Sequence, residues 1–389
     1  MVTEQLIVKS GYKETQVGTI PEDWDLDEIQ NHSSITTGAK NTQDKIKNGK
    51  FPFFVRSQKI EKINTYSFNG EAVLTAGDGV GTGKIFHYIN GKFDFHQRVY
   101  KISNFDDCLD GYFFYIYFSN YFLTRIMSMN AKSSVDSVRK HMISEMLIPL
   151  PEKNEQIIIS TAMKNIMALI ETFDKIIEKK KNIKQGTMQE LLTGKKRLEG
   201  FSEEWINQKL GDVTRDIRDG THQTPIYVKN GIPFYSVESI TNDNFTDVKF
   251  ISEQEHLMLT KSFKIEKGDI LMTRIGSIGD CKLIDWDVNA SFYVSLALLK
   301  LNEKISPEFL YHYSKSNLFK KELEIRSLLW AVPKKINLGS ISETPLCVPA
   351  SKKEQKEIAK ILSDMDSEIE QLETKREKYI MIKNTMMQK

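Results

Sequence analysis

Two long stretches of the chain place apolar residues at the spacing of an α-helix. Residues 155–189 and residues 354–388 each contain 35 residues and no proline, and their apolar positions recur in alternating steps of four and three. This is the heptad pattern of helices that pack lengthwise against a partner. A helix of this length spans roughly 52 Å and needs a partner for its apolar stripe. The pattern therefore predicts two long helices that pack against each other.

The apolar stripes of the two helices lie 199 positions apart. Because the chain leaves the first helix, builds a domain and then returns, the simplest pairing is an antiparallel coiled coil. The polar faces, including Lys179 to Lys181, either face solvent or dock on a partner. The stripe residues expected to pack are Ile159, Met163, Ile166, Ile170, Phe173 and Ile177, with Ile358, Leu362, Met365, Ile369, Leu372 and Tyr379 in the second helix.

The repetition extends over the whole chain. "IPEDWDLDEI" at 20–29 resembles "FSEEWINQKL" at 201–210, and "GEAVLTAGDGVGTGKI" at 70–85 matches "GDILMTRIGSIGDCKL" at 268–283, which pairs Gly81 with Gly279. Short β-rich runs alternate with turns and helical segments, which predicts a mixed α/β (α+β) fold with an internal pseudo-twofold repeat. Similar domains with divergent loops indicate two related recognition sites. The predicted order is a domain at 1–152, a helix at 153–193, a domain at 194–350 and a helix at 351–389.

Composition limits the class of protein. Of the 389 residues, 40% are hydrophobic and 27% are charged, which is typical of a folded chain with two cores. No stretch resembles a signal peptide or a membrane helix, so we expect a cytoplasmic protein that does not bind membranes. The three cysteines lie far apart without a Cys-x-x-Cys pair, which argues against zinc. The net charge of +2 means that any DNA binding depends on local patches.

The sequence lacks the motifs of common catalytic sites. It has no HExxH motif, no serine nucleophile elbow and no Asn- or Asp-Pro-Pro-aromatic tetrapeptide of amino-methyltransferases. The glycine-rich stretch "GDGVGTGK" at 77–84 fails the P-loop spacing. It is either a tight turn between two strands or a turn whose amides, with Lys84 or its match Lys282, approach a phosphate backbone. These absences favour a binding protein over an enzyme.

Polar and basic clusters are candidates for DNA contact because their side chains can bond phosphates and base edges. Each cluster alone is more simply a solvated surface charge, but clusters recur in both halves. The runs "SVRKH" at 137–141 and "AVPKK" at 331–335 are expected to occupy equivalent places. The candidate DNA-binding residues are Arg56, Ser57, Gln58, Lys84, Gln97, Arg98, Arg139, Lys140, Thr221, His222, Gln223, Arg274, Ser277, Lys334 and Lys335.

Five segments spread over nearly the whole chain carry a family resemblance. They are "GYKETQVGTIPEDW", "IPLPEKNEQ", "KQGTMQELLTGKKRLEGFSEEW", "RDGTHQTPIYVKNGIPF" and "VPASKKEQKEIAKILSDMD". In combination they resemble the specificity (S) subunit of type I restriction-modification systems. The resemblance implies a non-catalytic subunit with two target-recognition domains. Each domain would recognise one half of a split, asymmetric double-stranded DNA target, and the helices would act as the spacer.

The resemblance also implies partners. Two copies of a methylation subunit would bring S-adenosylmethionine and methylate adenine N6, and a motor-nuclease restriction subunit that uses ATP and Mg would join for cleavage. No cofactor and no metal is expected on this chain. The pseudo-symmetry predicts that the two chain ends meet near the far tip of the rod. Three alternatives stay open at this point: a stand-alone DNA-binding protein or decoy, a fused restriction and methylation enzyme, and a coiled-coil scaffold.

Overall fold

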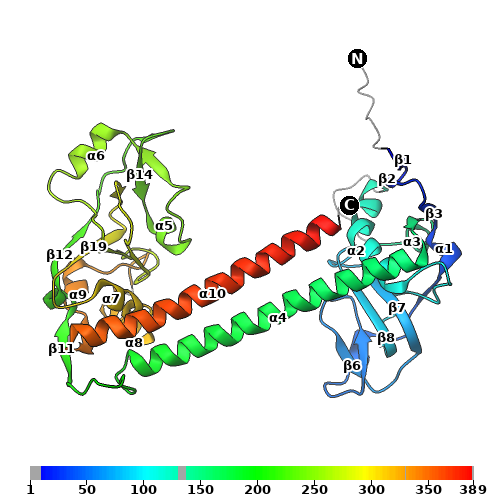
Figure 1. Cartoon of the computed structure of the whole chain (residues 1–389), viewed down its shortest axis with the longest axis horizontal. Helices are drawn as coiled ribbons and strands as arrows, with labels where there is room; N and C mark the ends of the chain where they lie inside the picture. Colours follow the sequence, from blue (N-terminus) through cyan, green and yellow to red (C-terminus); the bar gives the residue numbers. More distant parts are fainter. Residues whose placement is uncertain (1–9, 130–136, 329, 388–389) are drawn as a thin grey trace, which may run out of the picture. The chain divides into compact units, whose positions relative to one another are not determined.

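The protein divides into two compact units, each with one α/β domain. The computed structural model describes residues 10–129, 137–328 and 330–387. Unit 1 comprises Met1–Thr172 and Arg376–Lys389, and unit 2 comprises Phe173–Lys375. Each unit therefore contains a domain and a segment of both long helices (Figure 1). The predicted mixed α/β class with an internal repeat and two long helices is confirmed.

The first domain is built on a six-stranded sheet in the order β4-β9-β7-β8-β5-β6. Neighbouring strands are antiparallel except β5 and β8, which run parallel. Four phenylalanines of helix α2 (Gly111–Ser128) are buried in the core that includes Val73 and Ile102 of the sheet. The strands are β4 (Ser34–Thr37), β5 (Phe51–Phe54), β6 (Glu61–Ile63), β7 (Phe68–Ala76), β8 (Phe86–Phe95) and β9 (Val99–Ser103).

Short elements surround this sheet and lead into the first long helix. A small hairpin precedes the domain, and a two-stranded ladder, β3 with β10, brings residues on either side of the sheet together in antiparallel register. The elements are β1 (Tyr12–Thr15), β2 (Gly18–Pro21), β3 (Asp25–Glu28), α1 (Ile29–His32), η1 (Thr42–Asp44), α3 (Lys140–Ser144), β10 (Leu147–Leu150) and α4 (Lys153–Leu191).

The second domain has two four-stranded sheets, β12-β19-β16-β17 and β13-β15-β14-β18. Its strands are β11 (Trp205–Lys209), β12 (Thr214–Asp219), β13 (Tyr227–Val228), β14 (Ile232–Tyr235), β15 (Lys249–Ile251), β16 (Ile270–Thr273), β17 (Cys281–Leu283), β18 (Ser291–Phe292), β19 (Leu296–Leu301) and β20 (Pro345–Pro349). Its helices are η2 (Leu210–Val213), α5 (Val237–Thr241), α6 (Glu253–Leu259), α7 (Pro307–Ser314), α8 (Asn317–Arg326), α9 (Leu338–Ser342) and α10 (Lys352–Met386).

Strand pairing repeats between the two domains. The parallel pair of β5 with β8 has its counterpart in β14 with β18, and the ladder of β3 with β10 has its counterpart in β11 with β20. Two isolated parallel bridges, Lys40 with His96 and Thr221 with Tyr293, also match. The repeated sequence segments therefore correspond to a repeated topology.

A buried glutamine fixes the start of each long helix to its own domain. In unit 1, the Gln156 side chain accepts a hydrogen bond from the Asp110 amide at 2.8 Å and donates to the carbonyls of Cys108 and Pro151 at 2.8 Å. In unit 2, Gln355 accepts from the Ser306 amide at 2.8 Å. It donates to two further carbonyls at 3.3 and 2.9 Å. Both side chains are almost fully buried, so their amides satisfy backbone groups that water cannot reach.

Within unit 2, α4 and α10 run antiparallel, as predicted. Lys181 pairs with Glu373 at 2.7 Å and Lys184 pairs with Asp366, so rising residue numbers on one helix meet falling numbers on the other. Lys180 adds an ion pair with Glu368 at 2.6 Å. The lysine run that was expected to face solvent or a partner thus bonds across the helix pair at two of its positions. Such exposed pairs stabilise by roughly 0–1 kcal/mol each, and they specify direction and register.

The apolar stripes face protein, but they do not form one continuous helix-to-helix seam. All twelve predicted stripe residues are buried or partly buried. At the start of α10, Ile358 and Leu362 belong to the core of the second domain, together with Phe309 of α7. At the start of α4, Ile159 packs against the core of the first domain. Each stripe therefore joins its helix to the preceding domain before it can meet the other helix.

The last turns of α10 lie in unit 1 with the N-terminal domain. The Met387 carbonyl accepts hydrogen bonds from the Asn120 side chain at 3.2 Å and the Tyr121 hydroxyl at 3.0 Å. The C-terminal helix therefore contacts α2 of the first domain. A meeting of the two chain ends stays a prediction, because residues 1–9 lie outside the described residues.

Two classes of feature are missing from the part of the chain that the structure describes. No helix there combines the length and the apolar character needed to cross a membrane. Nor does that part bring together three or more His, Cys, Asp or Glu side chains in a group that could hold a metal ion.

Replacing Gln355 by alanine should lower the free energy of unfolding by about 2–4 kcal/mol, because three buried backbone groups lose their partner. The matched control is Gln371→Ala on the exposed face of the same helix, where we expect a change within about 0.5 kcal/mol. Urea unfolding followed by circular dichroism measures both. Equal effects of the two substitutions would show that the buried amide has no special role.

Candidate nucleic-acid interface

Three loops of the first domain bring two arginines onto one aspartate. Arg56 follows β5, Asp78 lies in the glycine-rich turn after β7, and Arg98 lies between β8 and β9. The Arg56 guanidinium donates to the Asp78 carboxylate at 2.7 Å, and Arg98 donates to its other oxygen. The Asp78 side chain is 18% exposed, whereas those of Arg56 and Arg98 are 39% and 60% exposed. The aspartate thus holds two guanidinium groups that stay accessible.

The protonation state of Asp78 follows from this geometry. Burial opposes its ionisation, but the hydrogen bonds from Arg98 and Arg56 outweigh burial, so the pKa of Asp78 lies below its usual value. The carboxylate therefore stays charged near neutral pH. The three side chains together carry one net positive charge, which suits contact with phosphate.

Other predicted residues of the first domain lie around this cluster. The Val138 amide donates to the Gly77 carbonyl at 2.7 Å, which places Arg139 next to the glycine-rich turn. The Gln97 side chain donates to Asn41 at 2.6 Å, on the loop after β4. Ser57 directly follows Arg56, and its carbonyl contacts a ring nitrogen of His87 at 3.0 Å. The side chains of Gln58, Lys84 and Lys140 are exposed.

The second domain gathers a partly different set of loops around a buried arginine. Arg274 donates to the Asp219 carboxylate at 2.8 Å and to the carbonyls of Val294 at 3.0 Å and Ile336 at 3.2 Å. Its side chain is only 9% exposed. The described contacts of Arg274 therefore join its own loop to those of Asp219, Val294 and Ile336. Contact of Arg274 with DNA stays a prediction. The His222 side chain is exposed, and its ring nitrogen lies 3.1 Å from the Asp219 carboxylate.

The remaining candidates of the second domain are close to Arg274. The Gly276 amide donates to the Lys334 carbonyl at 2.8 Å, and Lys335 bridges to Ile275. Ser277 donates to Asp280 in the same turn. Thr221 and Gln223 form a short turn after β12, where the Gln223 amide donates to the Thr221 hydroxyl at 3.3 Å. The polar candidates thus gather at one end of each domain.

The structure corrects two details of the predicted repeat. Val138 bonds the Gly77 carbonyl as Ile336 bonds the Arg274 carbonyl, so Ser137 corresponds to Lys335. The runs 137–141 and 331–335 therefore overlap at one position only and are not equivalent. The prediction failed because both runs were matched by basic composition, whereas the register is set by a buried apolar residue, Val138 or Ile336.

The glycine pairing within the turns is also shifted by the structure. Gly83 has a φ of +70°, and a Cβ at this position would lie 2.4 Å from Ile126 of α2. Gly279 has a φ of +85°, and its Cβ would lie 2.7 Å from Leu323 of α8. The counterpart of Gly279 by packing is therefore Gly83, and not Gly81. Close approach of a tight turn to a helix accounts for both glycines, and contact of these turns with phosphate stays a prediction.

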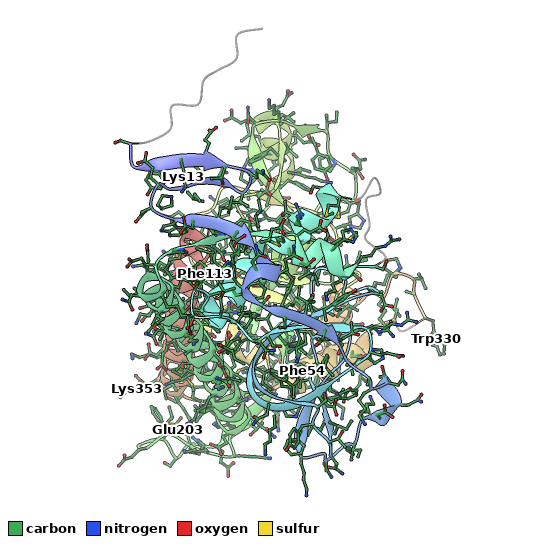
Figure 2. All side chains as sticks on the ribbon, turned by 90° about the vertical axis from the view of Figure 1, so that its right-hand side faces the viewer. Lys13, Phe54, Phe113, Glu203, Trp330 and Lys353 are labelled. Atoms are coloured by element: carbon green, nitrogen blue, oxygen red, sulfur yellow. The ribbon has the colours of Figure 1, made fainter. Side chains whose placement is uncertain are left out.

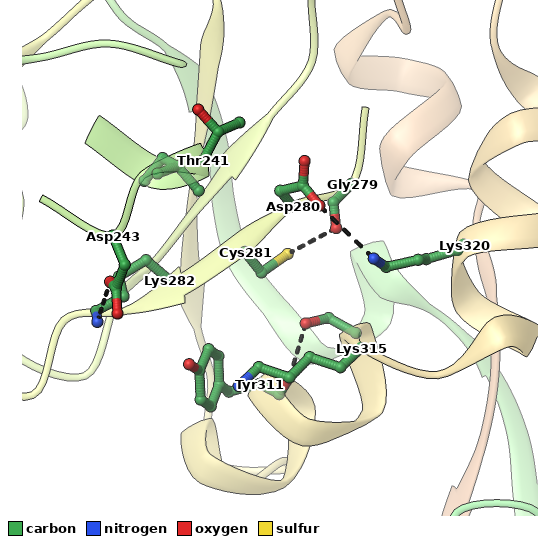
Figure 3. A pocket seen from close by; sticks show the side chains of 11 residues that line it. Thr241, Asp243, Gly279, Asp280, Cys281, Lys282, Tyr311, Lys315 and Lys320 are labelled. Atoms are coloured by element: carbon green, nitrogen blue, oxygen red, sulfur yellow. Dashed lines mark hydrogen bonds and ion pairs between the residues drawn. The ribbon is translucent and has the colours of Figure 1, made fainter. Parts of the chain in front are cut away.

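A cavity of about 330 Å³ lies between the second glycine turn and helices α7 and α8 (Figure 3). Its cations have partners: Lys282 pairs with Asp243, Lys320 lies 3.6 Å from Asp280, and Lys315 lies 3.9 Å above the Tyr311 ring. Burial raises the pKa of the Cys281 thiol to about 12, so this thiol is unreactive near neutral pH. Among the described residues that line it, the cavity therefore has no unpartnered lysine and no reactive thiol.

Two residues that organise the candidate interface escaped the sequence analysis. Asp78 and Asp219 hold the arginines in place, but an isolated aspartate beside a glycine gives no sequence signal that distinguishes it from an ordinary turn residue. The two copies do not align at these positions, since Asp78 lies after β7 and Asp219 lies at the end of β12. Only the folded structure brings each aspartate to its arginine.

Comparisons with known proteins agree on one family. The model of the family described as type I restriction modification DNA specificity domain matches residues 21–185 and 202–380. The MjaVIII specificity subunit of Methanocaldococcus jannaschii is 25% identical over 95% of this chain and 92% of that protein. The EcoDI specificity subunit of Escherichia coli is 27% identical over 49% of this chain. That alignment spans only 41% of the E. coli protein.

Solved structures show the same fold. The S subunit of a type I restriction-modification system from M. genitalium superimposes with a TM-score of 0.67 and 18% identity, over 94% of this chain and 95% of that one. A chain from work on complex assembly and conformational transition of the type I R-M system gives 0.52 and 14%, over 95% and 97%. At these identities the likeness establishes the fold alone.

Replacing Arg98 by glutamine should weaken binding to duplex DNA about 3- to 10-fold and should lower the salt dependence by about one counterion, because one phosphate contact is lost. The control is Lys92→Gln, an exposed charge whose strand pairs with Asn69, at the other end of β7 from the cluster. Fluorescence anisotropy at several salt concentrations compares the two variants. An equal loss in both would mean that only net charge matters and that the cluster is not a contact site.

Proposed function

This chain belongs to the type I restriction modification DNA specificity family, and we propose that it recognises a split, asymmetric DNA target, with one half-site for each domain. The observation that carries the proposal is the repeated cluster of loops. Three corresponding loops meet at one end of each domain: those after β7 and β16, those between β8 and β9 and between β18 and β19, and those at Val138 and Ile336. The side chains presented there differ: Arg56 and Arg98 in unit 1, and His222 and Lys335 in unit 2. A repeated frame with unequal loops suits two different half-sites.

Phosphate contacts and base contacts would divide between these residues. The accessible guanidinium groups of Arg56 and Arg98 and the exposed ammonium of Lys335 would position each domain on the phosphate backbone. Side chains with paired donors and acceptors, Gln97 and Gln223, would contact base edges, where each good paired contact discriminates by about 1–3 kcal/mol. Base recognition thus falls to loop residues that the fold itself does not need.

The paired helices would set the distance between the half-sites. Each helix is fixed to its domain by a buried glutamine, and cross-helix ion pairs hold one direction and register in unit 2. A rod held in this way transmits a fixed separation, which a flexible linker would not. The spacer role is supported by these joints.

The chain would act with enzyme partners in the cytoplasm. Two methylation subunits would bring S-adenosylmethionine and methylate adenine N6, and a restriction subunit using ATP and Mg would add cleavage. Duplex adenine has to leave the stack to be methylated, so the specificity subunit has to hold the DNA firmly beside it.

Methylome sequencing in a methylation-free host tests the proposal. Expression of the chain with its methylation subunit should yield N6-methyladenine in one bipartite, asymmetric motif, and either protein alone should yield none. A stand-alone DNA-binding protein would leave no methylation in any condition. To exclude an inactive partner, the same methylation subunit is expressed with a second, active specificity subunit.

Inserting one heptad into each helix, after Lys181 and after Glu368, tests the spacer role. These positions face each other through the ion pairs of Lys180 and Lys181. Seven residues add about 10 Å, which is the length of roughly three base pairs at about 3.4 Å each. The methylome should then show unchanged half-sites with a gap longer by about two or three base pairs. Altered half-site bases with an unchanged gap would contradict the spacer role.

A further inference from the structure

Two apolar side chains in the connection from α8 to α9 are almost fully exposed, and we call this pair, Trp330 and Val332, the tip. Trp330 is 97% exposed and Val332 is 99% exposed, although large apolar side chains are normally at least partly covered. The chain has four tryptophans, and the other three are partly buried. Figure 2 shows the Trp330 side chain extending away from the ribbon. Exposure alone does not identify a ligand, so the surroundings of this ring decide what it could contact.

The base of this loop is fixed to the candidate DNA-binding end of the second domain. The Leu328 amide donates to the Lys335 carbonyl at 2.8 Å, which closes the loop. The Gly276 amide donates to the Lys334 carbonyl at 2.8 Å, and the Ile336 amide donates to the Arg274 carbonyl at 2.9 Å. Backbone hydrogen bonds of Leu328, Lys334 and Ile336 therefore anchor the chain on either side of the tip next to the second glycine turn.

The charges beside the tip favour DNA as the ligand. Lys335 is exposed and has no ion pair among the residues that the structure describes, and Lys334 lies 3.8 Å from Glu324. A protein interface is usually depleted of lysine around its aromatic residues. Apolar side chains flanked by lysines are typical of proteins that insert a wedge between base pairs while cations hold the adjacent phosphates.

The first unit also has an apolar side chain at the corresponding end, but on a different loop. Val80, in the turn that contains Asp78, is fully exposed, and a Cβ on the adjacent Gly79 would lie 3.8 Å from Arg56. The second glycine turn exposes no such residue, because Ile278 packs against the core. Each unit therefore places an apolar tip beside its cationic loops, which a solvated loop would not require.

We propose that Trp330 inserts between base pairs of the half-site bound by the second domain. The ring would stack on an exposed base face, Val332 would fill the widened step, and Lys335 would contact the flanking phosphate. This role rests on the proposed DNA recognition and adds to it a distortion of the duplex. Opening one step lowers the energy needed to move a neighbouring base out of the stack, which the methylation subunit requires.

Acrylamide quenching of tryptophan fluorescence tests the insertion directly. The full chain and its Trp330→Phe variant are each measured alone, with the methylation subunit, and with both that subunit and a duplex that carries the methylome-derived target. The difference between the two proteins reports Trp330. We expect strong quenching until the target duplex is added, and protection afterwards.

Binding affinities provide the second measurement. Trp330→Ala should weaken binding of the target duplex about tenfold, as loss of base stacking does, whereas Trp330→Phe should stay within about threefold of the wild type. The control is Leu257→Ala, which truncates an exposed apolar residue of α6 and should leave affinity unchanged. A far-ultraviolet circular dichroism spectrum of each variant verifies folding.

The outcomes separate the two proposals. Specific binding with Trp330 still open to acrylamide would overturn the insertion alone, as would an alanine variant with wild-type affinity. Protection by the methylation subunit without DNA would also overturn it and would assign Trp330 to a protein interface. Absence of specific duplex binding by the wild-type complex would overturn the proposed function and the insertion together.

Discussion

The geometry of the molecule depends on one repeated contact, the buried glutamine at the start of each long helix. Gln156 and Gln355 each accept one backbone amide and donate to two carbonyls, so each long helix leaves its domain in a direction set by three hydrogen bonds. Backbone groups there are buried and have no water available, and an incorrect helix direction would leave them unpaired. A long rod amplifies any angular error at its base, so rigidity at this joint decides how accurately its far end is placed.

A second constraint acts on the charged side chains at the domain ends. Arginines have to be held in place by a carboxylate while enough positive charge stays exposed at the surface. In unit 1 the carboxylate of Asp78 is shared by two arginines, and both guanidinium groups stay accessible. In unit 2 Arg274 is buried and hydrogen-bonds to the surrounding loops, while Lys334 and Lys335 are exposed. The arginines are therefore exposed at the end of the first domain and buried at the end of the second, so the two outer surfaces differ chemically.

Much of the fold could be predicted because periodicity reports burial directly. The stripes from Ile159 to Ile177 and from Ile358 to Tyr379 indicated two long helices, and repeated segments such as 70–85 and 268–283 indicated two similar domains. Register within the loops could not be predicted, since matching the run 137–141 to 331–335 set Lys334 against Lys140, whereas the structure sets Lys335 against Ser137. The roles of Asp78 and Asp219 were equally hidden, because their partners come from loops distant in sequence.

The loops at the domain ends are joined through main-chain groups as well as through the arginine–aspartate pairs. Val138 bonds to Gly77, Ile336 bonds to Arg274, and Gly276 bonds to Lys334 through amide and carbonyl, regardless of which side chains those residues carry. Outward-facing side chains can therefore be exchanged during evolution while the loop scaffold persists. Substitutions at these exposed positions would change the chemistry of the surface at each domain end and leave the loop-to-loop hydrogen bonds intact.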